Sequence, residues 1–192
     1  MKLVFATQNR NKLNEVRLLL PSKFQLLSLA DIGCTEEILE TADTLEENAL
    51  IKADYIYSKF GYPCFADDTG LLVEALNGAP GVRSARYAGE HKNAADNMEK
   101  LLMKLRPHPN RRARFVTVIA LKISEESKLF IGQVEGLITS EKRGAGGFGY
   151  DPIFQPDGYL NTFAEQPIRL KNEISHRGRA LRQLTDYLSD LD

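Results

Sequence analysis

The sequence has little cysteine, little histidine and almost no net charge. Its 192 residues contain Cys34 and Cys64, which form no CxxC pattern, and only three histidines. This content excludes a disulfide framework and a zinc cluster. A formal net charge of −1 lacks the clustered positive charge that nucleic-acid binding uses, so we expect no nucleic-acid partner.

Long apolar runs are missing too. The apolar stretches fall short of a membrane span, and Met1 leads directly into KLVFATQN, which lacks the features of a secretory signal. We therefore expect a cytoplasmic protein with no membrane partner. The 43% apolar and 27% charged content is that of an ordinary globular protein. The length predicts one folding unit over residues 1–192, which can be bilobal.

Strand and helix patterns mix along the whole chain and predict an α/β domain with a mixed sheet. We expect strands at 2–6, 65–68, 113–123, 128–139 and 150–154, the third and fourth of them forming an antiparallel hairpin. We expect helices at 11–20, 45–60, 71–76, 93–105 and from about 175 onward.

The start of the first helix carries cations where the local field disfavours them. Arg10 and Lys12 lie in the opening turn, and no acid appears before Glu15. Because a helix start carries partial positive charge, this pattern predicts an anion in front of it. Thr7 and Asn9 would complete a phosphate site. The alternative is a solvated turn with Asn9 as a plain helix cap.

Lys52 lies near the middle of an apolar stripe on the next helix. Such a lysine either extends its ammonium group to solvent or meets an anion. A candidate phosphate site elsewhere in the chain favours the anion.

Asp67 and Asp68 are adjacent carboxylates at the end of an apolar run. They would repel each other unless a cation lies beside them, and hard oxygen ligands suit Mg²⁺. Neighbours on a strand point to opposite sides, so one acid could face a metal while the other orients a water. The alternative is that an Asp merely caps a short helix at 71–76.

Two further stretches admit competing interpretations. The glycine-rich segment 144–152 is neither a P-loop nor a dinucleotide site, and its Phe148 either stacks on a base or packs in the core. Ser175 opens the last helix as a cap; the rival view, a serine nucleophile, lacks a nucleophile elbow.

Five stretches together resemble the inosine triphosphate pyrophosphatase family, also called the Ham1 family of non-canonical purine nucleoside triphosphate pyrophosphatases. In order along the chain they are TQNRNK at 7–12, ETADTLEENALIKA at 40–53, FADDTGLLVEALNGAPGVRSARYAGE at 65–90, GGFGYDPIF at 146–154 and SHRGRAL at 175–181. The resemblance implies Mg²⁺-dependent hydrolysis of ITP, dITP or XTP to the monophosphate and pyrophosphate. It also implies a long mixed sheet with helices on both sides, two lobes around a ligand cleft, and a homodimer.

The resemblance further assigns roles to residues. Asp68 matches the general base, and Glu40, Asp67 and Asp68 match metal-associated acids. The remaining matches are substrate-binding residues: phosphate contacts at Thr7, Asn9, Lys12 and Lys52; a base-stacking aromatic at Phe148; nucleotide contacts at Asp151, Lys171, His176 and Arg177; and neighbouring positions Thr69, Gly149, Tyr150 and Ser175.

One segment departs from the family pattern. Between the strand at 150–154 and the SHR motif, Pro167 and Leu170 interrupt what is more often a helix-friendly acidic stretch. This departure makes the place of Lys171 the least secure. A non-catalytic nucleotide-binding module and a nucleotide pyrophosphatase of the Maf type, which would prefer pyrimidine or modified nucleotides, remain rival classes.

Overall fold

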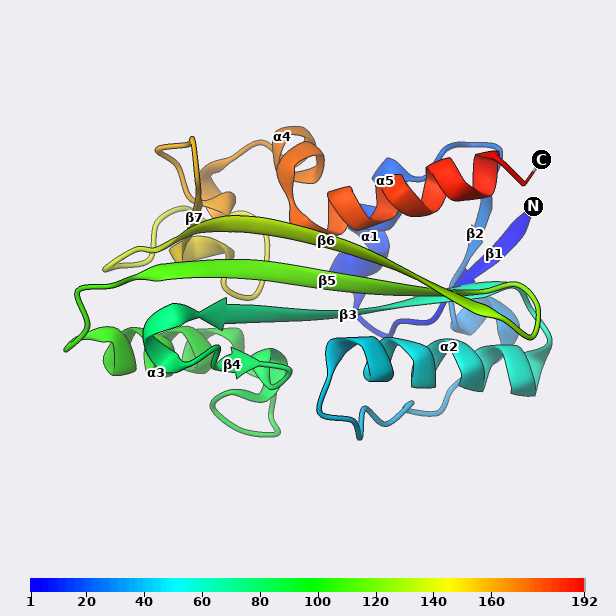
Figure 1. Cartoon of the computed structure of the whole chain (residues 1–192), viewed down its shortest axis with the longest axis horizontal. Helices are drawn as coiled ribbons and strands as arrows, with labels where there is room; N and C mark the ends of the chain where they lie inside the picture. The colour runs from blue at the N-terminus through cyan, green and yellow to red at the C-terminus, as the bar shows by residue number, and fades with distance from the viewer. Residues whose placement is uncertain (192) are drawn as a thin grey trace. The chain divides into compact units, whose positions relative to one another are not determined.

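A computed structural model describes residues 1–191 of the chain as a mixed α/β fold (Figure 1). The seven strands are β1 Lys2–Phe5, β2 Gln25–Leu27, β3 Cys64–Val73, β4 Pro80–Gly81, β5 Arg112–Lys122, β6 Ser127–Ile138 and β7 Phe154–Pro156. The α-helices are α1 Arg10–Leu19, α2 Leu45–Phe60, α3 Ala94–Leu105, α4 Ile168–Ile174 and α5 His176–Ser189.

The strands form one mixed sheet, as the sequence predicts. Its order is β2-β1-β3-β5-β6-β7, with β4 paired to β3. The pairs β1–β2 and β1–β3 are parallel, whereas β3–β4 and β6–β7 are antiparallel. No helix among residues 1–191 combines the length and apolar character that crossing a bilayer requires.

The chain divides into two compact units, and three of the strands contribute residues to both. Unit 1 comprises residues 1–68, 117–132 and 177–192, and unit 2 comprises 69–116 and 133–176. In unit 1, α1 and α5 cover one side of the strands and α2 covers the other (Figure 1). Phe5 and Phe65 stack in a core that also takes Val16 from α1 and Leu181 and Leu184 from α5.

Unit 2 has its own core. Phe115, Phe154 and Phe163 meet there, and α3 adds Leu101 and Leu105. Each unit therefore buries apolar side chains of its own, which is what holds each set of strands and helices together.

The predicted start and end of α2 are confirmed. The Thr44 hydroxyl accepts a hydrogen bond from the Glu47 N–H and donates one to the Glu47 carboxylate. Gly61 ends the helix in the left-handed region at φ 70°. This capping fixes where α2 begins and therefore which of its side chains point toward β3.

Three predicted elements differ from the structure. Residues 71–73 continue β3 instead of opening a helix, and only Glu74–Leu76 form a 3₁₀ turn, because Leu71 and Val73 are buried as strand residues. The strand expected at 150–154 begins only at Phe154, after a 3₁₀ turn at Asp151–Ile153. Pro167 does not interrupt a helix but is the N-cap of α4, which begins at Ile168, so its missing N–H removes no hydrogen bond within the helix.

Candidate active site

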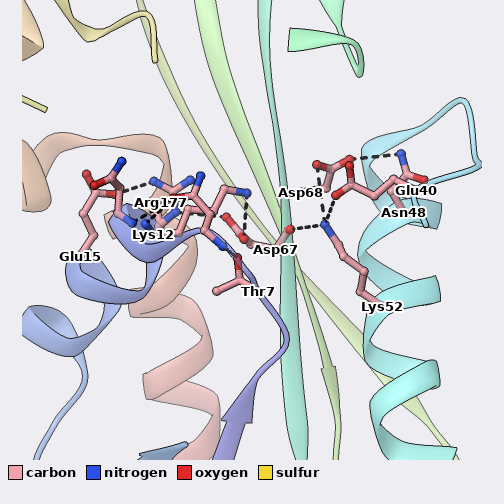
Figure 2. A network of polar contacts seen from close by, with 11 residues as sticks. Thr7, Lys12, Glu15, Glu40, Asn48, Lys52, Asp67, Asp68 and Arg177 are labelled. Carbon is pink, nitrogen blue, oxygen red and sulfur yellow. Dashed lines mark hydrogen bonds and ion pairs between the residues drawn. The ribbon is translucent and has the colours of Figure 1, made fainter. Parts of the chain in front are cut away.

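The middle of β3 carries Asp67 and Asp68 on opposite sides of the strand, as the alternation of strand side chains predicts (Figure 2). Asp67 points toward α1 and α5, and Asp68 points toward α2. Both residues are buried. Two sets of charged groups therefore lie back to back across one strand.

On the Asp67 side, cations and acids alternate. The Lys12 ammonium donates to Asp67 Oδ1 at 3.0 Å, and Arg177 Nε donates to Asp67 Oδ2 at 3.1 Å. Arg177 also donates from Nη1 to Glu15 Oε2 at 2.5 Å. Burial alone would raise the pKa of Asp67, but Lys12 and Arg177 outweigh it and hold this pKa well below its usual value. Asp67 is therefore held as a carboxylate.

On the Asp68 side, acids outnumber the cation. Lys52 donates to Glu40 Oε1 at 2.5 Å and to the Asp67 carbonyl oxygen at 2.7 Å, whereas Asp68 Oδ1 lies 3.9 Å from its ammonium. Asn48 donates to Asp68 Oδ2 at 3.3 Å. Burial raises the pKa of Asp68 and the neighbouring Glu40 and Asp67 carboxylates add to this, while Lys52 opposes it.

These contacts decide between several sequence interpretations. Lys52 is only 7% exposed, so it does not extend to solvent. Asp67 and Asp68 do not cap a helix, because the residues after them continue β3. Lys12 and Lys52 each meet an anion that the protein itself supplies, Asp67 and Glu40 respectively.

The start of α1 has the geometry of a capped helix. The Asn9 side-chain oxygen accepts from the N–H groups of Asn11 and Lys12, and the Asn9 N–H donates to the Thr7 hydroxyl. The first turn contains no acid. The capping interpretation of Asn9 is therefore correct, and phosphate binding by Thr7 and Asn9 stays a prediction.

Unit 2 gathers a second group of the predicted residues. The Asp151 carboxylate accepts from the Phe148 N–H at 2.8 Å and from the Lys171 ammonium at 2.6 Å. The same ammonium lies 4.8 Å from the centroid of the Phe148 ring. Gly147 has φ +69°, and a side chain there would collide with the Asp151 carboxylate. The glycine-rich turn is thus wrapped around Asp151.

Phe148 is half-buried and is not one of the residues of the unit 2 core. Its alternative place in that core is therefore wrong. Gly149 has φ 63°, and the Tyr150 hydroxyl donates to the Ser84 carbonyl oxygen at 2.8 Å. Tyr150 is buried and belongs to the core, so its part in substrate binding stays a prediction.

The remaining predicted residues lie on β3 and at the junction of α4 and α5. Thr69 follows Asp68 on β3 and is half-buried. Ser175 is the C-cap residue of α4 and is buried. Its N–H donates to the Lys171 carbonyl oxygen. His176 stacks on Phe115 with ring centroids 4.5 Å apart.

The model of the Ham1 family matches residues 3–187. The chain belongs to the Ham1 family. It is 57% identical over 189 residues to the dITP/XTP pyrophosphatase of Flavobacterium johnsoniae, covering 98% of each chain, and 56% identical to that of Porphyromonas gingivalis, covering 97% of each. The solved Ham1 protein of Staphylococcus aureus is 39% identical, with a TM-score of 0.91 and full coverage of both chains.

Membership of the Ham1 family raises the question of whether these acids fit a divalent cation. Residues 1–191 contain no group of three acids, histidines or cysteines that could hold a metal, so Glu40, Asp67 and Asp68 do not form one cluster. The physical reason is the strand alternation that separates Asp67 from Asp68. The Glu40 and Asp68 carboxylates both lie beside the Lys52 ammonium. One or two carboxylates suffice for Mg²⁺ when phosphates and waters complete its coordination, so these two acids fit the ion.

Two residues of this Ham1 site were missed by the sequence analysis. Glu15 binds Arg177, and Asn48 binds Asp68. Helix spacing could have found both, because Glu15 follows Lys12 by one turn and Asn48 precedes Lys52 by one turn, so each shares a face with a predicted residue.

Proposed function

We propose that this protein hydrolyses non-canonical purine nucleoside triphosphates, namely ITP, dITP and XTP, to the monophosphate and pyrophosphate with Mg²⁺, and so removes them from the nucleotide pool. The observation that carries the proposal is the acid pair beside Lys52, in a member of the Ham1 family. Relatives more than 50% identical over nearly their whole length are named dITP/XTP pyrophosphatases.

Glu40 and Asp68 would hold Mg²⁺ together with the phosphates of the substrate. The bound ion supplies neutralisation of the phosphate charge and an acidified water. Asp67 stays with Lys12 and Arg177, since both of its carboxylate oxygens already accept hydrogen bonds from them. Asp67 therefore contributes a fixed negative charge on the other side of β3 from Glu40 and Asp68.

Asp68 acts as the general base that takes the proton from the attacking water. Attack at the α phosphorus releases pyrophosphate. The protein's other task is to position the triphosphate and stabilise its charge.

Lys12 and Lys52 bind the phosphates, with Thr7 and Asn9 adding polar contacts at the start of α1. Each lysine now pairs with an acid, so a triphosphate competes with or joins an existing ion pair. Burial is the largest influence on Lys12 and lowers its pKa, which leaves a desolvated ammonium that gains strongly from a second anion.

The purine base stacks on Phe148. A ring has two faces, so Lys171 can approach one while a base covers the other. The 6-keto oxygen of hypoxanthine or xanthine accepts hydrogen bonds, and the family resemblance assigns His176 or Arg177 as its donor. Adenine presents an amino group at this position, so a donor would face a donor. The other substrate-binding candidates are Thr69, Gly149, Tyr150, Asp151 and Ser175.

One experiment tests this function directly. Purified protein is incubated with ITP, dITP, XTP, ATP, GTP and CTP, with and without Mg²⁺, and pyrophosphate is measured separately from orthophosphate. We expect pyrophosphate from the first three substrates only when Mg²⁺ is present. Release of orthophosphate alone, or a preference for pyrimidines, would contradict the proposal.

We also propose a cytoplasmic homodimer, in line with the role of the enzyme in the nucleotide pool. Light scattering coupled to size-exclusion chromatography checks the oligomeric state. A mass equal to the 21.5 kDa chain across micromolar concentrations would contradict the dimer.

A further inference from the structure

Asn48 connects the Asp68 carboxylate to the backbone of Ala42, two residues after Glu40, through a single side chain. It lies on α2 and is fully buried. Its side-chain nitrogen donates to Asp68 Oδ2 at 3.3 Å and to the Ala42 carbonyl oxygen at 3.2 Å. Its side-chain oxygen accepts from the Ala42 N–H at 3.0 Å.

These contacts connect two otherwise separate parts of unit 1. Ala42 belongs to the segment between Glu40 and the Thr44 cap, so the amide of Asn48 fixes the backbone two residues after Glu40. The same amide fixes one oxygen of Asp68 on β3 (Figure 2). Lys52 also contacts both Glu40 and Asp68.

We propose that Asn48 is a positioning residue that holds the Glu40 segment and the Asp68 carboxylate in one fixed arrangement, so that both acids face the same divalent cation. The proposal rests on the proposed function for the identity of the cation. The Asn48 amide donates to Asp68 and accepts from the Ala42 N–H, and a carboxylate, which has no donor, could not make both contacts. Groups that orient metal ligands in this way typically account for roughly a 10–100-fold difference in metal affinity.

The fold contains a matched control for a purely structural role. Asn97 on α3 is also buried, and its side chain accepts from the Ala88 N–H at 2.6 Å and donates to the Ala85 carbonyl oxygen at 2.9 Å. It therefore fixes a loop preceding its helix as Asn48 does, but its amide bonds only to this backbone. Asn48→Ala and Asn97→Ala each remove a buried helix-to-loop contact, and only the first removes a contact to an acid.

The first experiment measures Mn²⁺ binding to the full-length protein without nucleotide. The electron paramagnetic resonance signal of free Mn²⁺ reports how much of the ion remains unbound. We expect Asn48→Ala to raise the Mn²⁺ dissociation constant about tenfold or more. Asn97→Ala should stay within about twofold of the wild type while lowering the melting temperature comparably. Equal Mn²⁺ affinity in wild type and Asn48→Ala, or an equal loss in both variants, would overturn the proposal.

A second variant covers the case in which Asn48→Ala does not fold. Asn48→Asp keeps an acceptor for the Ala42 N–H but places a carboxylate against Asp68. The two acids repel each other, so Mn²⁺ should raise the melting temperature of this variant more than that of the wild type. An identical Mn²⁺-induced shift in melting temperature would mean that the contact between residue 48 and Asp68 has no influence on the metal site, which would overturn the proposal.

Failure of this inference is distinguishable from failure of the proposed function. If the wild type releases no pyrophosphate from ITP, dITP or XTP, the function fails, yet the Mn²⁺ comparison still decides the role of Asn48. If the wild type cleaves these substrates and the Mn²⁺ affinity does not depend on Asn48, only the positioning role fails.

Discussion

The two sides of β3 differ in how their charges are satisfied. On the Asp67 side, Lys12 and Arg177 face Asp67 and Glu15, so the charges cancel within the protein. On the Asp68 side, Lys52 faces both Asp68 and Glu40. The pKa values follow this difference, lowered for Asp67 and raised for Asp68. We infer that the first set stabilises the fold and that the second is built to receive a cation.

The largest effect is expected from Asp68→Asn. The substitution removes the proposed base, so kcat for ITP should fall by roughly 10²–10⁴-fold. It also removes a carboxylate from a site with surplus negative charge, so the free energy of unfolding should not decrease. Steady-state kinetics and urea denaturation check the two outcomes. Near-normal turnover would remove Asp68 from the base role.

Asp67→Asn, in contrast, should lower the free energy of unfolding. It leaves the buried guanidinium of Arg177 and the ammonium of Lys12 without their shared carboxylate, although Glu15 still binds Arg177. Breaking a buried ion pair typically costs about 3–5 kcal/mol. Urea denaturation at neutral pH measures the loss. If Asp67→Asn were as stable as Asp68→Asn, the contrast between the two sides would be refuted.

Lys12→Ala is expected to weaken substrate binding and, because Lys12 also pairs with the buried Asp67, to lower stability. A charged hydrogen bond contributes about 1.5–3 kcal/mol, so KM for ITP should rise roughly 10–100-fold. The control is Lys59→Ala on α2, whose ammonium pairs with Glu36 on an exposed surface. The control should leave both kcat and KM unchanged. Unchanged KM and kcat in Lys12→Ala would end its phosphate role.

The smallest expected effect is the pH dependence of the Asp67 contribution to stability. The folded pKa of Asp67 is lowered, so the unfolded chain binds more protons below the ordinary aspartate pKa of about 3.9. The stability that Asp67 confers is therefore full above that pH and is lost as pH falls through the folded value. The difference between wild type and Asp67→Asn in urea denaturation should shrink below about pH 4. A constant difference from pH 6 to pH 3 would contradict this.

Local patterns in the sequence were enough to predict one part of the site. The capping box predicted the start of α2. The apolar stripe indicated the buried face on which Lys52 lies, and strand alternation predicted that Asp67 and Asp68 point to opposite sides. Each of these conclusions depends on residues close together in the chain.

Pairing between distant residues could not be predicted in the same way. Arg177 and Asp67 are separated by 110 positions, and only the packing of α5 against the strands brings them together. The sequence showed unpaired charges because their partners lie on other elements. For the same reason the stretch 71–73 was mistaken for a helix, since burial against α3 and its neighbours decides its state.

The alternation along β3 has a consequence for how this protein can fail. A slip of one residue would bring Asp68 to Lys12 and Arg177, and Thr69 would then stand beside Asn48 and Glu40. Such a slip would also move Phe65 out of its stack with Phe5 and put Ala66 in its place, so the apolar packing of β3 opposes it. The misaligned chain would keep its structural ion pairs and lose its catalytic acid. The contact between Phe5 and Phe65 thus protects the catalytic acid, because two identical neighbours alone would let the ion pairs form in the wrong register.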